Sequence, residues 1–550
     1  MLIMPVMAVL QHKANGEIRR YLVDGSGVSI GRQLGNVIRI DDTMSSRFHC
    51  VVEQRGPSAL VRDLKSRNGT KVNGQPIREH ELHDGDVIQI GRTKIVFAAA
   101  TATDQQENKL KSLTSGVSDK AADDLKSVAE SLPSKDFHAN DLQILNTRGQ
   151  VVHHAADDPS NPEKGKKTAE AVTLLRMVLL VCFRTRASDV HVEPKQDHTL
   201  VRARIDGTLV DIAKLNSDLG TRLMSLVKIL CDIDIGGRNI IQEGSFAARV
   251  PDRRVDYRVS YSPSVAGQKL VIRVLDEANA PRYLFELDLP DNVFGEMDTS
   301  MRRDSGMILV CGPTGSGKTA TLYATLRSID SSERNVVTIE DPVEIRLEGI
   351  TQMPVDEKSG SGFAELLRST LRQDPDVILV GEIRDNETAK TAVQAAMTGH
   401  LVLSTVHARD TVSSVFRLMD LGVEPFALAN GLQNLISQRL VRRLCPACKV
   451  AVPISDADKA KLGDAAENVT VTYRPHGCTR CLGTGFSGRR GCFELLTVND
   501  DVRNAITSGE GQQAVIEALK GTGYRSLRDA GRELVAQGIT TMEELDRVLG

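Results

Sequence analysis

The chain has 550 residues and a mass of 59.9 kDa, too long for one core, because domains usually hold about 100–200 residues. Hydrophobic residues make up 41% and charged residues 26%, which excludes a collagen-like, a mostly disordered or an integral membrane protein. Lys and Arg number 69 against 72 Asp and Glu, so the net charge of -3 does not predict a general nucleic-acid binder.

The first residues, MLIMPVMAVLQHK, are apolar but lack the basic region and the small-residue cleavage site of a signal peptide. They predict a first β-strand. The longest apolar stretch, Ala171 to Phe183, is shorter than a membrane span and contains Arg176. Nine cysteines are too few for a disulfide scaffold and suit a reducing compartment. We therefore expect a cytoplasmic protein, unless a partner holds it at a membrane.

Residues 1–98 alternate short β-branched runs with Gly, Asn and Asp turns, which predicts an all-β sandwich. The sequences IGR, SSRFH and SRNGTKVNG lie on loops between the predicted strands. They resemble those of a forkhead-associated (FHA) domain, a β-sandwich that binds phosphothreonine peptides.

This resemblance implies a role for each matching loop residue. Arg32, Ser46 and Arg47 would meet the phosphate, Asn68 would hold the peptide backbone, and His49 and Gly69 would shape the loops. A phosphate dianion does need charged and hydroxyl donors that converge from several loops. The alternative is a degenerate FHA domain with a purely structural role.

Three further segments follow the sandwich. Residues 99–168 are polar with little periodicity, which predicts a flexible linker with at most a short helix. Residues 169–295 begin with a helical pattern and continue in alternating strands, a mixed α/β domain. Residues 296–550 repeat strand, turn and helix, which predicts a parallel sheet with covering helices. Within them we expect a cysteine-bearing subdomain at about 441–495 and helices over 496–550.

The segment MILVCGPTGSGKTATLYATL reads as strand, glycine loop and helix and contains G-x-x-x-x-G-K-[ST]. In this context the loop N–H groups and the helix N-terminus hold phosphates, Lys318 reaches the β- and γ-oxygens, and Thr319 is placed for Mg²⁺. The motif predicts a P-loop NTPase. The predicted nucleotide-binding residues are Gly312, Pro313, Thr314, Gly315, Ser316, Gly317, Lys318, Thr319 and Ala320.

Three later strands end in polar residues, where α/β sheets hold their ligands. The first ends at Glu340 and Asp341, and the second ends at Glu382, with Gly381 where a usual Walker B strand has Asp. Glu382 is expected to hold Mg²⁺ through water or to polarise the attacking water. Glu340 is the alternative residue for polarising the attacking water.

The third strand has His400 and His407 at its two ends. A histidine beside a γ-phosphate can report its presence by hydrogen bonding. For His400 a packed structural role is an equal alternative.

Together these motifs resemble the secretion ATPase superfamily, the motors of type II secretion and type IV pilus assembly. GPTGSGKT, TIEDPVE, LRQDPDVILVGEIRD and TGHLVLSTVHA occur in the family's order and spacing. ASDVHVEP, RIDGTL and RVSYSPSVAGQKLVIRVLD resemble its upstream domain. The resemblance covers about 165–550. It implies a RecA-like ATPase domain, a hexameric ring, and ATP held between the upstream and P-loop domains.

Arginines can stabilise the charge of phosphoryl transfer, also from a neighbouring subunit. Arg368 and Arg372 have i, i+4 spacing, which can present both to one site, although a solvated basic face is the alternative. The resemblance implies that Arg258 reaches ATP from the upstream domain. Ser245 stands where the family commonly has arginine, which puts the basal turnover in question. The predicted catalytic residues are Lys318, Glu382, Glu340, Asp341, His407, Arg258, Arg368 and Arg372.

Two CxxC pairs, Cys445 with Cys448 and Cys478 with Cys481, are separated by 29 residues. Two such pairs complete a tetrahedral Cys₄ shell with no open position, which predicts a structural Zn²⁺ rather than four free thiols. The surrounding sequence resembles the cysteine-bearing subdomain of the assembly and export motors. The other five cysteines are expected to be buried core residues. They are Cys50, Cys182, Cys231, Cys311 and Cys492.

The motifs predict a Mg²⁺-dependent ATPase. The resemblance implies that it is a hexamer that drives pseudopilin or pilin assembly through an inner-membrane platform protein, and no direct nucleic-acid contact is expected. A phosphothreonine protein or a Ser/Thr kinase is the further expected partner. Assembly motors of the family usually carry a different N-terminal domain that docks on a membrane partner. The FHA-like sequence stands in its place here, which leaves the docking route open. Alternatives are a DNA-uptake or conjugation motor of the same superfamily, or a phosphopeptide-binding scaffold with a vestigial ATPase.

Overall fold

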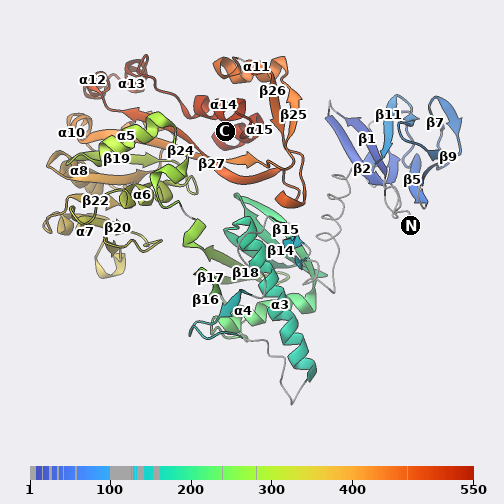
Figure 1. Ribbon diagram of the computed structural model, residues 1–550, viewed down its shortest axis with the longest axis horizontal. Helices are drawn as coiled ribbons and strands as arrows, with labels where there is room; N and C mark the ends of the chain where they lie inside the picture. The colour runs from blue at the N-terminus through green and yellow to red at the C-terminus, as the bar shows by residue number, and fades with distance from the viewer. Residues whose placement is uncertain are drawn as a thin grey trace.

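The structure is a computed structural model, shown in Figure 1. It describes residues 8–14, 17–23, 28–33, 36–40, 42–55, 58–99, 125–126, 128–130, 132, 141–152, 162–237, 239–279, 281–467 and 469–550. The first predicted strand is present from Ala8, and the preceding residues lie outside the described part.

The N-terminal unit is the predicted sandwich of two antiparallel sheets. One sheet has the strand order β2-β1-β11-β10-β7-β8, and the other has the order β4-β3-β5-β6-β9, in which β3 and β4 are parallel. Apolar side chains from both sheets, among them Ile30, Val52 and Ile88, fill one core. The strands are β1 (Ala8–Ala14), β2 (Glu17–Val23), β3 (Val28–Gly31), β4 (Ile38–Arg39), β5 (Cys50–Arg55), β6 (Ser58–Asp63), β7 (Thr70–Val72), β8 (Gln75–Ile77), β9 (Glu79–Leu82), β10 (Val87–Ile90) and β11 (Thr93–Ala99).

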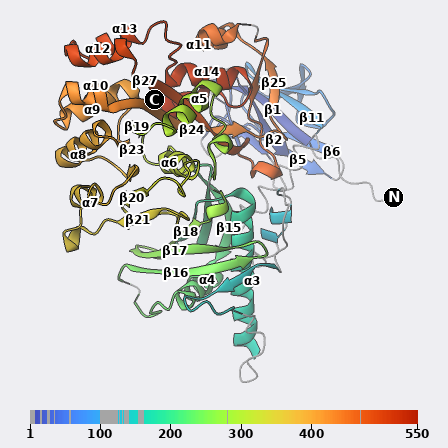
Figure 2. The ribbon, with the colours of Figure 1, turned by 60° about the vertical axis from the view of Figure 1, so that its left-hand side comes forward.

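The upstream domain is one antiparallel sheet with the strand order β12-β16-β17-β18-β13-β14-β15. The helices α3 (Pro162–Thr185) and α4 (Ser217–Leu230) cover one face of it, because their apolar side chains share a core with every second residue of the strands (Figure 2). The strands are β12 (Gln143–Leu145), β13 (Asp189–Pro194), β14 (His198–Ile205), β15 (Thr208–Asn216), β16 (Gln242–Val250), β17 (Arg253–Ser264) and β18 (Gly267–Leu275).

This domain begins before Ala169, where the sequence pattern placed its boundary. β12 pairs antiparallel with β16. Leu125, Val128 and Leu142 are buried in the core of the upstream domain. Part of the polar stretch that we expected to be a linker therefore belongs to this fold, because its few apolar residues complete the sheet edge and the core.

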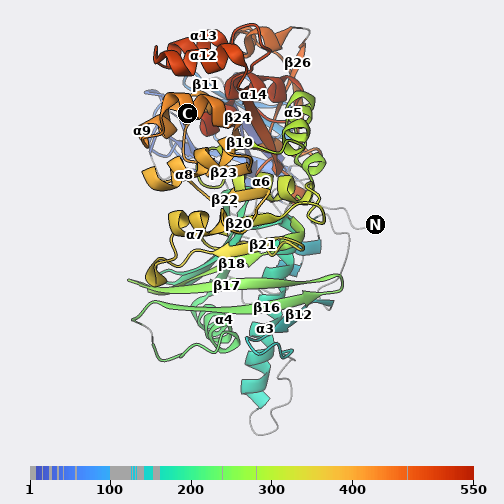
Figure 3. The same cartoon turned by 90° about the vertical axis from the view of Figure 1, so that its left-hand side faces the viewer.

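The ATPase domain is built on a sheet with the order β21-β20-β22-β23-β19-β24-β27, parallel except for the last pair. Figure 3 shows α5 and α6 on one face and α7, α8 and α9 on the other, and two separate apolar cores lie under these helix layers. This confirms the predicted parallel sheet. The strands are β19 (Gly306–Cys311), β20 (Val336–Glu340), β21 (Thr351–Pro354), β22 (Val377–Val380), β23 (Leu401–Val406), β24 (Leu432–Leu444) and β27 (Phe486–Thr497). The helices are α5 (Asp291–Met301), α6 (Lys318–Arg327), α7 (Phe363–Thr370), α8 (Asn386–Met397), α9 (Thr411–Asp420) and α10 (Pro425–Gly431).

The cysteine-bearing subdomain contains the hairpin β25 (Val450–Pro453) and β26 (Val471–Arg474) and the helix α11 (Asp456–Leu462). Four helices end the chain, α12 (Asp500–Ser508), α13 (Gln512–Ala518), α14 (Leu527–Ala536) and α15 (Met542–Leu549). Within the described ranges, no helix combines the length and the apolar character that crossing a membrane would require.

Candidate functional site

The glycine loop joins β19 to α6, and α6 begins at Lys318. Gly317 has φ of 93°, and a Cβ there would lie 2.7 Å from the side-chain nitrogen of Gln438, so both backbone and space require glycine. Since the first N–H groups of a helix have no intrahelical partner, the start of α6 offers donors to an anion.

The side chains of the loop are also suited to phosphate. Lys318 Nζ donates to the carbonyl oxygens of Gly312 and Pro313, at 2.9 and 3.1 Å. Burial lowers the pKa of Lys318, while the nearby negative charge of Glu382 opposes this shift. Ser316 Oγ is buried and has no hydrogen-bond partner among the described residues. A phosphate group would supply the missing acceptor.

A cavity of about 400 Å³ lies against this loop, a size that is ordinary for a small-molecule site. Glycine-loop residues, strand-end residues and the ring of Phe363 line it. Its titratable lining residues are Lys318, Tyr323, Glu340, Asp341, Glu344, Glu382, Arg384 and His407. The structure thus brings together five of the predicted catalytic residues.

Glu340 is held from three sides at the end of β20 and is only 4% exposed. The hydroxyl of Tyr323 donates to Oε2, whereas Thr338 Oγ1 at 2.5 Å and Gln352 Nε2 at 3.0 Å donate to Oε1. These donors come from α6, β20 and β21, so the orientation of this carboxylate depends on three elements.

Glu382 follows β22 and is held differently, by the side chains of Arg384 and His407, which also line the cavity. Arg384 Nη2 lies 2.5 Å from Oε1, and His407 Nε2 lies 3.4 Å from Oε2. The hydrogen bond to Glu382 and its charge raise the pKa of Arg384. Glu382 lines the same cavity as Lys318, where its carboxylate can serve a cation or a water molecule.

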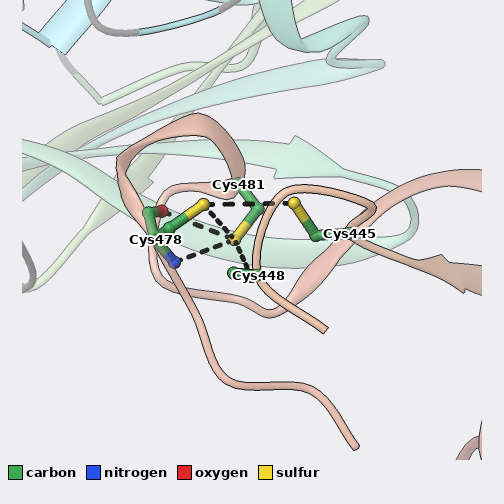
Figure 4. A group of neighbouring side chains, drawn as sticks. All are labelled: Cys445, Cys448, Cys478 and Cys481. Carbon is green, nitrogen blue, oxygen red and sulfur yellow. Dashed lines mark hydrogen bonds between the residues drawn. The ribbon is translucent and has the colours of Figure 1, made fainter. Parts of the chain in front are cut away.

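The four paired cysteines form one buried cluster, in which their side chains turn toward one another from two loops (Figure 4). The Sγ atoms of Cys445 and Cys478 are 4.0 Å apart, and Cys481 Sγ lies 3.8 Å from both Cys448 Sγ and Cys478 Sγ. Tetrahedral zinc with bonds of about 2.3 Å places its sulfurs about 3.8 Å apart, so the cluster fits this ion. The N–H groups of Cys478 and Gly485 donate to Cys481 Sγ, each at 3.2 Å, and support a thiolate.

In the sandwich, the predicted phosphopeptide residues lie on three neighbouring loops. Arg32 N–H donates to Ser46 O at 3.1 Å, and Asn68 Nδ2 donates to Met44 O at 2.7 Å. Arg32 and Arg47 are exposed, and no described acidic group forms an ion pair with either. The arginines are thus available to an anion.

His49 and Gly31 hold these loops in place. The buried ring of His49 accepts from Ser46 N–H at 3.0 Å through Nδ1, so Nε2 carries the proton and donates to Gly69 O at 3.2 Å. A Cβ on Gly31 would lie 2.3 Å from Arg47 O, which makes glycine necessary there. These contacts agree with the predicted loop-shaping role of His49.

Comparison with known proteins identifies the family. Residues 164–547 match the family described as type II/IV secretion system protein, and residues 28–91 match the FHA domain. The chain belongs to the type II/IV secretion system protein family. It is a secretion ATPase with an N-terminal FHA domain, which confirms the predicted fold class and enzyme class.

Relatives share most of this ATPase. Type II secretion system protein E of Klebsiella pneumoniae is 46% identical over 380 residues, which are 69% of this chain and 76% of the relative. Type II secretion system ATPase E of Vibrio cholerae is 41% identical over 398 residues, which are 72% of this chain and 78% of the relative. The ATPase DotB of Legionella pneumophila has a similar fold, with a TM-score of 0.51 and 21% identity over 68% of this chain and 95% of that one.

Three predicted arginines of this secretion ATPase lie away from the cavity lining. Arg258 is exposed on β17, in register with Ser245 and Arg273. Arg368 pairs with Glu387 and Glu365, and Arg372 donates to the carbonyl of Arg368 at 2.9 Å. The i, i+4 spacing therefore does not bring these arginines to the cavity of their own chain.

His400 also lies outside the lining, with Nδ1 at 3.0 Å from Ala395 O, a contact that suits a structural role. Tyr323 and Arg384 do line the cavity, although no sequence motif marks either of them as a site residue. Tyr323 occupies an apolar helix position, and Arg384 is one arginine among many. For Arg384 the only signal was its place two residues after Glu382.

Proposed function

We propose that the cavity binds Mg²⁺-ATP and that the two glutamates have different roles in hydrolysis, Glu382 at the metal ion and Glu340 at the attacking water. Lys318 would neutralise the phosphate oxygens, and Thr319 with Glu382 would hold the ion. When bound, Mg²⁺ supplies charge neutralisation at the β- and γ-oxygens. The contacts of Glu382 with Arg384 and His407, at the cavity that all three residues line, support this assignment.

Glu340 would orient the attacking water. An ionised carboxylate offers about four acceptor sites, and three donors from the protein engage this one. The remaining site can accept a hydrogen bond from water in the cavity that Glu340 lines. A fixed carboxylate is what positioning a nucleophile requires.

The protein would act as a hexameric motor for pseudopilin or pilin assembly, at the cytoplasmic side of the inner membrane through a platform protein. The observation that supports this is the similarity to type II secretion ATPases over most of both chains. Arg258, Arg368 and Arg372 would then serve sites between subunits or domains, because they lie outside the cavity lining of their own chain.

Cells that lack the protein test this role. We expect them to lose secretion of exported proteins or surface pili, and complementation by the wild-type chain should restore it. Loss of DNA uptake with secretion and pili intact would instead assign the motor to DNA transport. Normal behaviour in all three assays would support the scaffold alternative.

The FHA domain would bind a phosphothreonine protein and so recruit or regulate the motor. The exposed Arg32 and Arg47 beside Ser46, on loops held by His49, support this proposal. Structural zinc in the four-cysteine cluster would complete the fold.

Arg47→Ala in the full chain should weaken phosphothreonine-peptide binding at least about tenfold, since it removes a charge-assisted contact to phosphate. ATP turnover should stay unchanged, because the residue lies in another domain. Calorimetry with paired phosphorylated and unphosphorylated peptides measures the effect. Arg62→Ala is the matched control, since Arg62 is paired with Glu53 on the strands rather than on the loops. If the wild type bound both peptide sets with equal affinity, phosphothreonine recognition would be rejected, and the FHA domain would be a protein–protein adaptor that does not depend on phosphorylation.

A further inference from the structure

Tyr323 connects the phosphate-binding helix to the carboxylate at the end of β20. It is the sixth residue of α6, which begins at Lys318, and its side chain is 2% exposed. Its hydroxyl donates to Glu340 Oε2 and accepts from Glu344 N–H at 3.3 Å. Burial, and then the contact with Glu340, raises the pKa of Tyr323, so the hydroxyl keeps its proton and donates it to the carboxylate.

The two oxygens of Glu340 are fixed by different means. Thr338 and Gln352 both donate to Oε1, and Gln352 is itself held because its amide accepts from Leu347 N–H at 2.7 Å. Tyr323 is the donor that the described residues offer to Oε2. Without that hydroxyl, the carboxylate would be fixed at one oxygen and able to rotate about it.

The ring of Tyr323 has a separate role. It packs in the apolar core between α6 and the sheet, together with Ile308, Leu347 and Leu379. Phenylalanine would keep this packing and lose the hydroxyl, with its contacts to Glu340 and to Glu344 N–H. One substitution therefore separates the packing of the ring from the hydrogen bonds of the hydroxyl.

We propose that Tyr323 is a positioning residue for ATP hydrolysis, whose hydroxyl sets the orientation of Glu340 toward the attacking water. This inference rests on the proposed role of Glu340. The contact also couples α6 to the Glu340 carboxylate. If α6 shifts when phosphates bind at Lys318, the hydroxyl that holds Oε2 shifts with it.

The test is a double-mutant cycle in the full chain. Tyr323→Phe should lower kcat about tenfold or more, the effect of one hydrogen bond to a charged group, with KM and nucleotide affinity nearly unchanged. Glu340→Gln should lower kcat further. In the Glu340→Gln background, Tyr323→Phe should cause little additional loss, because the group that it positions is no longer a carboxylate.

Thr338→Val is a second variant, since it removes a donor to the other oxygen at a β-strand position that valine suits. It should also lower kcat, and again not in the Glu340→Gln background. Tyr261→Phe is the matched control. It deletes a buried tyrosine hydroxyl that donates to Met224 O at 2.7 Å in the upstream domain, and it should leave kcat unchanged.

Three results would overturn the inference. An equal loss of kcat from Tyr323→Phe with and without Glu340 would make the tyrosine structural. A raised nucleotide Kd with unchanged kcat would assign it to the phosphate-binding helix alone. Full activity of Glu340→Gln would instead reject the proposed role of Glu340. The single variant, in which Tyr323 is unchanged, is enough to show this. Single-turnover assays with labelled ATP keep even slow variants measurable.

Discussion

Lys318→Ala should lower ATP turnover by at least about 100-fold, because it removes the cation that meets the developing charge on the β- and γ-oxygens. In the structure Lys318 Nζ lies on the glycine loop against the cavity, bonded to two loop carbonyls. Folding does not depend on these two hydrogen bonds, since both carbonyl oxygens can accept hydrogen bonds from water in the variant. The loss should therefore fall on catalysis and nucleotide binding, as measured by phosphate release.

The control is Lys461→Ala, which removes an exposed lysine from α11, far from the glycine loop in sequence and fold. It should keep wild-type turnover. Thermal unfolding of both variants should match that of the wild type. Wild-type turnover by Lys318→Ala would show that another site hydrolyses ATP.

The cavity at the glycine loop was predictable from the sequence because its parts are local. The glycine loop, Lys318 and the ends of three buried strands lie within short motifs, and parallel strands bring their carboxyl ends to one edge. The cysteine cluster was predictable for a similar reason. Each pair sits in one turn, and few arrangements other than a shared ion bring four buried cysteines together.

Contacts between distant elements were not predictable. Tyr323 lies in an apolar helix pattern that reads as core, and only its approach to Glu340, 17 residues later, gives it a partner in the cavity. The spacing of Arg368 and Arg372 places them on one helix face, but the acidic residues of α8 and α7 decide where Arg368 points. β12 has three residues in a polar stretch, too few for a periodic signal.

Zinc removal should affect more than the cysteine loops, because the cluster touches the upstream domain. Leu482, the residue after Cys481, is buried in the upstream core. Nearby, Gly488 N–H donates to Asp206 Oδ2 at 2.7 Å, and Arg442 Nη1 donates to Thr208 Oγ1 at 3.3 Å. The turn at Asp206 thus docks on β24 and β27 close to where these strands join the two cysteine loops.

Cys481→Ser should abolish metal binding, from one zinc per chain to none, and destabilise the loops around it. In small zinc domains the apparent binding free energy is about 10–16 kcal/mol at neutral pH, and this is folding free energy. Elemental analysis measures the metal. Hydrogen exchange should show lost protection around residues 478–490 and also at the turn near Asp206, because Leu482 directly follows Cys481 and Gly488 lies at the start of β27, next to the loosened loop.

Cys492→Ser is the matched control, because it makes the same chemical change at a buried cysteine outside the cluster. Cys492 Sγ donates to Leu527 O at 3.1 Å, and a serine hydroxyl can replace that donor. This variant should keep its zinc and its exchange protection. A metal-free wild type, purified without chelator, would reject the zinc site. Zinc loss in Cys481→Ser with full protection at Asp206 would confine the metal's influence to its own loops.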